Sequence, residues 1–244
     1  MAKEAPDYSV DPHLSPAVKA FLKPLNAGGP AVESLSEQDA REVLLNLQVS
    51  VKVDLSGVDE SEKTITQVGC TVKLTVVRPK GNKEKLPVFI FTHGGGWVLG
   101  DYPTHKRLVR DLVVASECAA VFVNYTLSPE AHYPQAIHEI YAAAKWVSEH
   151  GDEIRKEKYA SPLQSSLEEL KDLPPTLIQV AENDILRDEG EAYGRKLEQA
   201  GVKVLSVRYN GMIHDFGMLN GLAETTQVRG LIELAAAELK KHLH

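Results

Sequence analysis

Apolar residues recur at helical spacing in the first part of the chain. They do so over Ser15–Leu25 and again over Ser34–Leu47, and each stretch predicts a helix. Ser36 followed by Asp39 is typical of an N-cap with an acidic first turn. The sequence Asn-Ala-Gly-Gly-Pro at 26–30 separates the two helical patterns and predicts a break between them.

The period then changes to one that favours strands. Val49–Leu55 and Cys70–Val77 alternate, which predicts antiparallel strands. Continuous apolar runs, typical of strands buried on both faces of a parallel sheet, occupy Leu86–Phe91, Ala119–Val123 and Thr176–Val180. The remaining patterns predict helices at Thr104–Ser116, Pro134–His150, Asp188–Ala200 and Val228–Leu243, and a strand at Val202–Tyr209. This alternation predicts an α/β fold with a mostly parallel sheet flanked by helices, in which ligands bind beyond the carboxyl ends of strands.

Composition narrows the function classes. The net charge is −7 and no cluster of five like charges occurs, so general nucleic-acid binding is disfavoured. Cys70 and Cys118 cannot form a disulfide framework, and neither has a partner at zinc-ligand spacing. The start of the chain has no apolar region of the signal-peptide kind, and the longest apolar runs are far shorter than the about 20 residues of a membrane span. We therefore expect a cytoplasmic protein of 244 residues without a membrane span or metal site.

The sequence His93-Gly94-Gly95-Gly96-Trp97 follows the predicted strand Leu86–Phe91. Glycines allow backbone N–H groups to approach a substrate closely and to point outward together. Two or three aligned N–H donors are what an oxyanion needs when a carbonyl carbon becomes tetrahedral. A plain glycine-rich turn is the alternative, whereas a phosphate loop is disfavoured because no Lys-Ser or Lys-Thr follows at the required spacing.

Two further motifs contain carboxylates after predicted strands. Residues 125–130 (Tyr-Thr-Leu-Ser-Pro-Glu) predict a strand-to-helix connection, in which Glu130 could orient a neighbouring loop by hydrogen bonding. Asp184 follows the strand Thr176–Val180 and suits a turn, and Asp188 suits the N-cap or first turn of the next helix.

His214 follows the last predicted strand, one helix and one strand after Asp184. In a parallel sheet this order places both residues on adjacent strand-end loops, within reach of one another. An Asp that fixes the tautomer of a His makes up two-thirds of a Ser-His-Asp system. An isolated His is more often structural, and that alternative stays open.

These motifs in this order resemble the hormone-sensitive-lipase-like branch of the α/β-hydrolase fold, which contains carboxylesterases and acetyl esterases. Residues 93–97 resemble its oxyanion-hole motif. Residues 125–130 resemble its Tyr-Arg-Leu-Ala-Pro-Glu, with Thr126 in place of Arg and Ser128 in place of Ala. Residues 159–163 and 173–177 are similar to the run into the strand that bears the triad acid.

The resemblance implies hydrolysis of small to medium acyl esters without a metal or organic cofactor. His214 would be the general base, Asp184 would orient it, and the backbone N–H groups of Gly94, Gly95 and Gly96 would form the oxyanion hole. It also implies two parts: cap-like helices over residues 1–48 and a hydrolase core over residues 49–244.

The nucleophile of this family is missing from the sequence. No serine or cysteine has glycine two residues before and two residues after it, as the Gly-x-Ser-x-Gly turn requires. The helix Pro134–His150 is followed by Ile154 and then by Arg155, where the sequence already resembles a segment far downstream in the family. The central strands and the elbow between them are therefore predicted to be deleted there. One repair would pair Thr176–Val180 directly beside Leu86–Phe91.

Three interpretations follow. In the first, the complete form is a serine carboxylesterase, and this shortened chain has little or no triad-based turnover. In the second, the glycine loop binds a small ester or carboxylate without chemistry. In the third, the chain is a scaffold or a homo-oligomer subunit that uses the strand edges exposed by the deletion.

Overall fold

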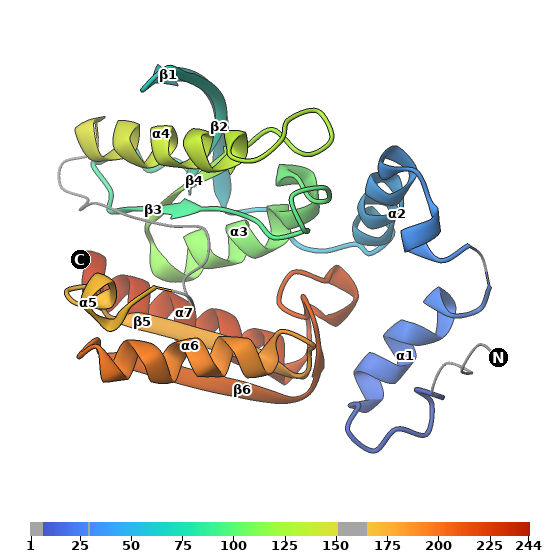
Figure 1. Ribbon diagram of the computed structural model, residues 1–244. Helices are drawn as coiled ribbons and strands as arrows, with labels where there is room; N and C mark the ends of the chain where they lie inside the picture. Colours follow the sequence, from blue (N-terminus) through green and yellow to red (C-terminus); the bar gives the residue numbers. More distant parts are fainter. Residues whose placement is uncertain (1–6, 29, 151–164) are drawn as a thin grey trace. The chain divides into compact units, whose positions relative to one another are not determined.

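The computed structural model describes residues 7–28, 30–150 and 165–244 (Figure 1). It divides into two compact units. The first unit comprises Met1–Gly29 and Ser161–Leu231, and the second comprises Pro30–Ala160 and Ile232–His244. The predicted deletion point between Ile154 and Arg155, and the segment 159–163, lie outside the described residues.

The second unit contains a four-stranded mixed sheet in the order β1-β2-β4-β3. Its strands are β1 (Val58–Gln67), β2 (Cys70–Pro79), β3 (Val88–Phe91) and β4 (Ala119–Asn124). Strand β2 pairs antiparallel with β1 and β4, whereas β3 pairs parallel with β4.

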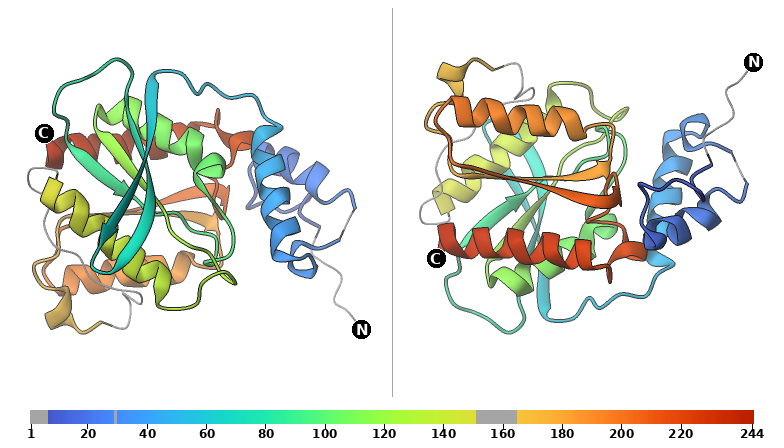
Figure 2. Two further views of the ribbon diagram at one scale, coloured as in Figure 1. Left: turned by 90° about the horizontal axis from the view of Figure 1, so that it is seen from above. Right: turned by 90° about the horizontal axis from the view of Figure 1, so that it is seen from below.

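Helices cover both faces of this sheet (Figure 1, Figure 2). On one face, α4 (Gln135–His150) packs Ala143 and Val147 against Leu74 and Val123. On the other face, α3 (Tyr102–Ser116) packs apolar side chains against β4. Strand β4, which lies between the two helices, is almost completely buried, as its continuous apolar run predicts.

Two further elements belong to the second unit. A short 3-10 turn (Val32–Ser34) precedes α2 (Glu37–Val49). Buried Gln48 of α2 donates to the Thr104 carbonyl of α3 at 2.6 Å, which ties the two helices together.

The first unit contains the parallel pair β5 (Thr176–Asn183) and β6 (Val204–Ile213). Helix α6 (Arg187–Gln199) connects them and packs its buried Leu197 with Val202 and Leu170. The unit also includes α1, α5 and a 3-10 turn, at Pro16–Leu25, Leu167–Leu170 and Asn220–Leu222. Helix α7 (Thr226–Leu243) crosses from the first unit to the second along the chain.

The predicted helices are confirmed, and so is the N-cap predicted at Ser36; α1 has a cap of the same kind. The Ser15 hydroxyl accepts a hydrogen bond from the Val18 N–H at the start of α1. The Ser36 hydroxyl accepts one from the Asp39 N–H at the start of α2. A short polar side chain before an apolar helical pattern satisfies one of the free N–H groups, which is why such starts can be read from sequence.

The predicted strand Val49–Leu55 is wrong. Val49 is the last residue of α2, and residues 51–57 lie in neither a helix nor a strand. The strand instead begins at Val58 and pairs along its whole length with β2, although Ile65 is its one buried residue. A strand at the edge of a sheet can be held by backbone hydrogen bonds while its side chains stay exposed. The polar strand β1 therefore has no apolar pattern from which it could be predicted.

Two of the three continuous apolar runs are less buried than predicted. Every residue of β3 is half-buried, and so is β5 except for Ala181. Among the described residues, β3 pairs only with β4, and β5 pairs only with β6. A strand with one open edge shields its side chains less than a central strand does.

The four described strand pairings comprise two parallel and two antiparallel ones. The predicted α/β class is confirmed, and the antiparallel share comes from the β1–β2 hairpin and its junction with β4. No described helix is both long and apolar enough to cross a membrane.

Candidate active site

The glycine loop after β3 has a conformation that other residues cannot easily adopt. Gly95 has φ +111°, and a Cβ added there would lie 2.1 Å from the Leu99 carbonyl oxygen. The N–H groups of Val98 and Leu99 both donate to the Gly95 carbonyl, at 3.1 and 2.9 Å, and close a tight turn. Glycine is therefore required at position 95 both for the backbone angle and for space.

Three consecutive N–H groups of this loop have no acceptor in the part of the chain that the structure describes. Within the described residues, the backbone N–H groups of Gly94, Gly95 and Gly96 donate to no oxygen or nitrogen atom. A Cβ added at Gly94 or Gly96 would meet nothing within 4 Å, so the space around both is open. Free N–H groups in a glycine-rich turn form a binding site for an anion or a developing oxyanion.

His93 supports the loop from its buried side. Its Nδ1 lies 2.7 Å from the Gly94 carbonyl oxygen, and its ring stacks on Tyr125 with centroids 4.4 Å apart. The Tyr125 hydroxyl donates to the His93 carbonyl at 2.8 Å. Burial lowers the pKa of His93 and outweighs the opposing hydrogen bond to Gly94. A neutral, stacked ring suits a structural support of the loop.

The connection after β4 is fixed by a buried carboxylate. Glu139 of α4 accepts hydrogen bonds from the Thr126 N–H at 2.6 Å, from the Thr126 hydroxyl at 3.0 Å and from Gln135 at 2.8 Å. Its buried charge thereby has three donors. The sequence shows only a Glu in an amphipathic helix, so this positioning role could not be predicted. Glu130 in the same connection bonds to Arg41 of α2.

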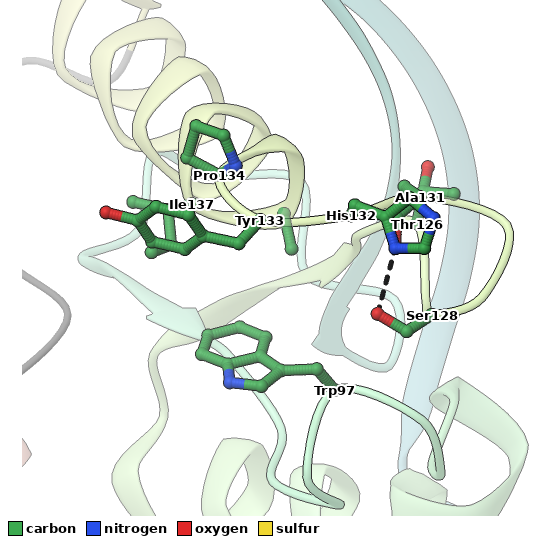
Figure 3. Close-up of a pocket in the computed structure, with 9 residues that line it drawn as sticks. Trp97, Thr126, Ser128, Ala131, His132, Tyr133, Pro134 and Ile137 are labelled. Carbon is green, nitrogen blue, oxygen red and sulfur yellow. Dashed lines mark hydrogen bonds between the residues drawn. The ribbon is translucent and has the colours of Figure 1, made fainter.

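A small pocket lies between Trp97 and the start of α4 (Figure 3). Its volume is about 100 Å³, and its lining is mostly apolar. The Trp97 ring faces Tyr133, Pro134 and Ile137 across it (Figure 3). The remaining lining residues are Thr126, Ser128, Ala131, His132 and Ala136. Trp97, which lines this pocket, directly follows Gly96 in the sequence.

Asp184 and His214 meet as their positions in the sequence predict. Asn183, the last residue of β5, pairs with Ile213, the last residue of β6, so the residues that follow are neighbours. Nδ1 of His214 donates to Oδ2 of Asp184 at 2.9 Å. Oδ1 of Asp184 accepts from the Leu186 N–H at 2.8 Å, so the predicted turn role holds as well. Asp188 lies in the first turn of α6, as predicted.

A second carboxylate faces the other ring nitrogen of His214. Nε2 lies 3.5 Å from Oδ2 of Asp215, and the His214 side chain is 54% exposed. Burial alone would lower the pKa of His214, but the hydrogen bond to Asp184 and the charges of Asp215 and Asp184 outweigh it and raise the pKa. Burial raises the pKa of Asp215, against the opposing charge of His214. The imidazolium form is therefore stabilised from two sides.

Glu182 fixes the backbone beside His214 and was missed in the sequence. It accepts a hydrogen bond from the Gly211 N–H at 2.7 Å, and His13 lies 3.4 Å away. The bond to Gly211 and the contact with His13 lower the pKa of Glu182. The Gly211 carbonyl in turn accepts from the Ser15 N–H at 3.0 Å. The one signal in the sequence is a second acid two residues before Asp184.

The acid–base pair lies in the first unit, and the glycine loop lies in the second. The described residues contain no group of three or more His, Cys, Asp or Glu residues arranged to hold a metal ion.

Comparison with known proteins finds the same fold. The family model described as the alpha/beta hydrolase fold matches residues 89–157 and 151–218. The crystal structure of a thermostable esterase from Pseudomonas putida ECU1011 is 42% identical, covers 96% of this chain and 99% of that chain, and has a TM-score of 0.90.

Two curated relatives agree with this result. An alpha/beta hydrolase of Acanthamoeba polyphaga mimivirus is 28% identical over 313 positions, covering 94% of this chain and 88% of the relative. Carboxylesterase NlhH of Mycobacterium tuberculosis is 31% identical over 144 residues, covering 59% of this chain and 44% of the relative.

These matches show that the chain belongs to the α/β-hydrolase fold family. Within that family, its esterase relatives place it in the hormone-sensitive-lipase-like carboxylesterase branch.

Proposed function

We propose that this chain contains the oxyanion-binding and acid–base parts of a serine carboxylesterase, and that it lacks the nucleophile needed for triad-based turnover. The observation that supports this most is the 2.9 Å contact of His214 with Asp184, in a sequence without a Gly-x-Ser-x-Gly turn. Asp184 and His214 are hydrogen-bonded, as the acid and the base of a triad would be, whereas the nucleophilic serine is absent from the sequence.

In the complete form, a serine oxygen would attack the ester carbonyl carbon and lose its proton to Nε2 of His214. His214 would return that proton to the leaving alcohol, and Asp184 would stabilise the imidazolium between the two steps. The N–H groups of Gly94, Gly95 and Gly96 would stabilise the oxyanion. The pocket of about 100 Å³ beside Trp97 supports small acyl or alcohol groups as the substrate class.

Two features of the comparisons support an internal deletion near Ile154. The family model matches in two segments, which meet at residues 151–157. The alignment with the mimivirus relative is 313 positions long, whereas this chain has 244 residues, so the relative has residues that this chain lacks.

A second candidate function is the binding of a small carboxylate without chemistry. The free N–H groups at Gly94, Gly95 and Gly96 favour it, because a carboxylate has the charge and size of the oxyanion for which such a loop is built. The apolar pocket beside Trp97 would hold the rest of the ligand. Saturable thermal stabilisation by benzoate would support this function, and the lack of any stabilisation would exclude it for this ligand class.

We also propose that the chain works in the cytoplasm. Both of its cysteines, Cys70 and Cys118, are free thiols, which suits a reducing compartment.

Steady-state hydrolysis of p-nitrophenyl acetate tests the leading proposal. We expect the parent chain and His214→Ala to hydrolyse this ester at the same slow rate, since without a serine His214 has no proton to accept from a nucleophile. A rate in the parent that falls by about 10³-fold or more in His214→Ala would show a working triad and overturn the proposal.

A further inference from the structure

One side chain of helix α2, that of Arg41, contacts both the glycine loop and the connection after β4. We propose that Arg41 is a positioning residue that holds the glycine loop and the connection after β4 in register. Its Nε donates to the Val98 carbonyl at 2.8 Å, and its Nη2 donates to the Ser128 carbonyl at 2.8 Å. These partners lie 57 and 87 residues further along the chain.

Glu130 fixes the orientation of the Arg41 guanidinium. Nη1 donates to Oε1 of Glu130 at 2.6 Å, and Nη2 donates to Oε2 at 2.9 Å. This two-point contact uses the planar fork of the guanidinium, and it leaves Nε and the second Nη2 hydrogen directed at the two carbonyls. A lysine has one nitrogen in place of three and cannot make these contacts together.

The hydrogen bond from Arg41 to the Val98 carbonyl also constrains the turn that contains the N–H groups of Gly94 to Gly96. The Val98 N–H closes the turn on the Gly95 carbonyl at 3.1 Å, so Arg41 holds the outer end of that turn. The Ser128 N–H donates to the Trp97 carbonyl at 2.8 Å, which joins the two loops directly. Arg41 therefore fixes both the donors at Gly94 to Gly96 and the wall of the pocket formed by Trp97.

Charge keeps this contact in place over a wide pH range. The hydrogen bond from Arg41 is the main cause that lowers the pKa of Glu130, to about 2. The side chain of Arg41 is 21% exposed and that of Glu130 is 54% exposed, so the ion pair itself adds little to stability. Its consequence is geometric: the donors are ordered before a ligand arrives.

The inference rests on the proposed use of the glycine loop as an anion-binding site, and the test separates the two. The chain has two tryptophans, so Trp146→Phe leaves Trp97 as the single indole fluorophore. In this background, acrylamide quenching of Trp97 measures the order of the loop without any ligand. Titration with benzoate then measures binding at the loop.

We expect Arg41→Lys to raise the acrylamide quenching constant of Trp97 and to weaken benzoate binding by about tenfold, equivalent to one lost hydrogen bond. The matched control is Arg208→Lys, which breaks another arginine–glutamate contact, in which Nε and Nη2 both reach Oε1 of Glu191, in the first unit. The control should leave both readouts at the parent values. Glu130→Gln should shift them in the same direction by a smaller amount, because it keeps an acceptor for the guanidinium.

Three outcomes decide the inference. A higher quenching constant in Arg41→Lys and Glu130→Gln supports it, even if the parent binds no benzoate, a result that would count against the ligand-binding function alone. If the quenching constant of Arg41→Lys equals that of Arg208→Lys, the inference is overturned. A lower melting temperature of Arg41→Lys with an unchanged quenching constant also overturns it, because a merely structural role would give that result. If Arg41→Lys does not fold, the quenching of Glu130→Gln decides in the same way.

Discussion

At the scale of single residues, His214 lies between two carboxylates, and this geometry gives its charge state a definite direction. Asp184 bonds to Nδ1 at 2.9 Å, and Asp215 lies 3.5 Å from Nε2. Burial opposes the imidazolium, but the hydrogen bond to Asp184 and the charges of Asp215 and Asp184 outweigh it and raise the pKa of His214. Because the folded pKa is raised, His214 stabilises the fold most at low pH, and this contribution is lost as pH rises through the raised pKa.

Asp184→Asn should lower the pKa of His214, because the amide removes the charge and the strongest hydrogen-bond acceptor of the ring. An NMR titration of the His214 ring protons in the parent and the variant measures the change. Asp188→Asn, which removes a carboxylate in the first turn of α6, should leave the titration of His214 unchanged. Equal His214 titrations in the parent and Asp184→Asn would show that the 2.9 Å contact is not formed in solution.

The glycine loop gives a second prediction, from two neighbouring residues with opposite surroundings. Gly95→Ala should destabilise the fold by at least about 2 kcal/mol, because φ is +111° and the new Cβ would clash with the Leu99 carbonyl oxygen. In a domain of this size, that loss lowers the melting temperature by about 4 to 8 °C. Gly94→Ala has open space and should leave the melting temperature within about 2 °C of the parent. Equal melting temperatures for the two variants would contradict the described loop.

At the scale of secondary structure, the β1–β2 hairpin contains a strained turn. Val68 and Gly69 have φ of 45° and 78°, which defines a two-residue turn with both central residues in the left-handed region. A β-branched side chain is unfavourable there, whereas Asn before Gly is the preferred pair. Val68 is exposed, so its side chain gains little from burial in return.

Val68→Asn should therefore stabilise the chain by about 1 kcal/mol, since it relieves backbone strain at a position without packing. Chemical denaturation gives the free energy of unfolding. Val49→Asn is the matched control: it changes a valine that is also exposed but has an ordinary helical conformation, and it should change stability by less than about 0.5 kcal/mol. Destabilisation by Val68→Asn would show that the turn has another conformation.

Elements with a local chemical signal could be predicted from the sequence, and elements that depend on distant partners could not. Ser15 and Ser36 start helices through contacts three residues away, so their pattern is visible in the chain. The strand Val58–Gln67 is formed by pairing with β2 and has almost no buried side chain, so no pattern reveals it. Arg41 was missed for the same reason, because its partners lie 57 to 89 residues away.

At the scale of the whole molecule, the site could be predicted in part. Asp184 and His214 meet because they follow the last residues of two paired parallel strands, a relation that the order of the elements implies. The absence of a Gly-x-Ser-x-Gly turn can be read directly from the sequence. The predicted burial of β3 and β5 failed, since each has only one described partner strand. In the proposed account, the segment missing near Ile154 contained the strands that would cover these edges.

In the proposed function, the chain has an acid, a base and an oxyanion loop but no nucleophilic serine. Intact-mass spectrometry after incubation with a fluorophosphonate probe tests it most directly, because the probe forms a covalent bond with an activated serine. The account predicts a mass near 26.8 kDa that the probe leaves unchanged. One phosphonate on each chain, attached to a serine, would contradict the account.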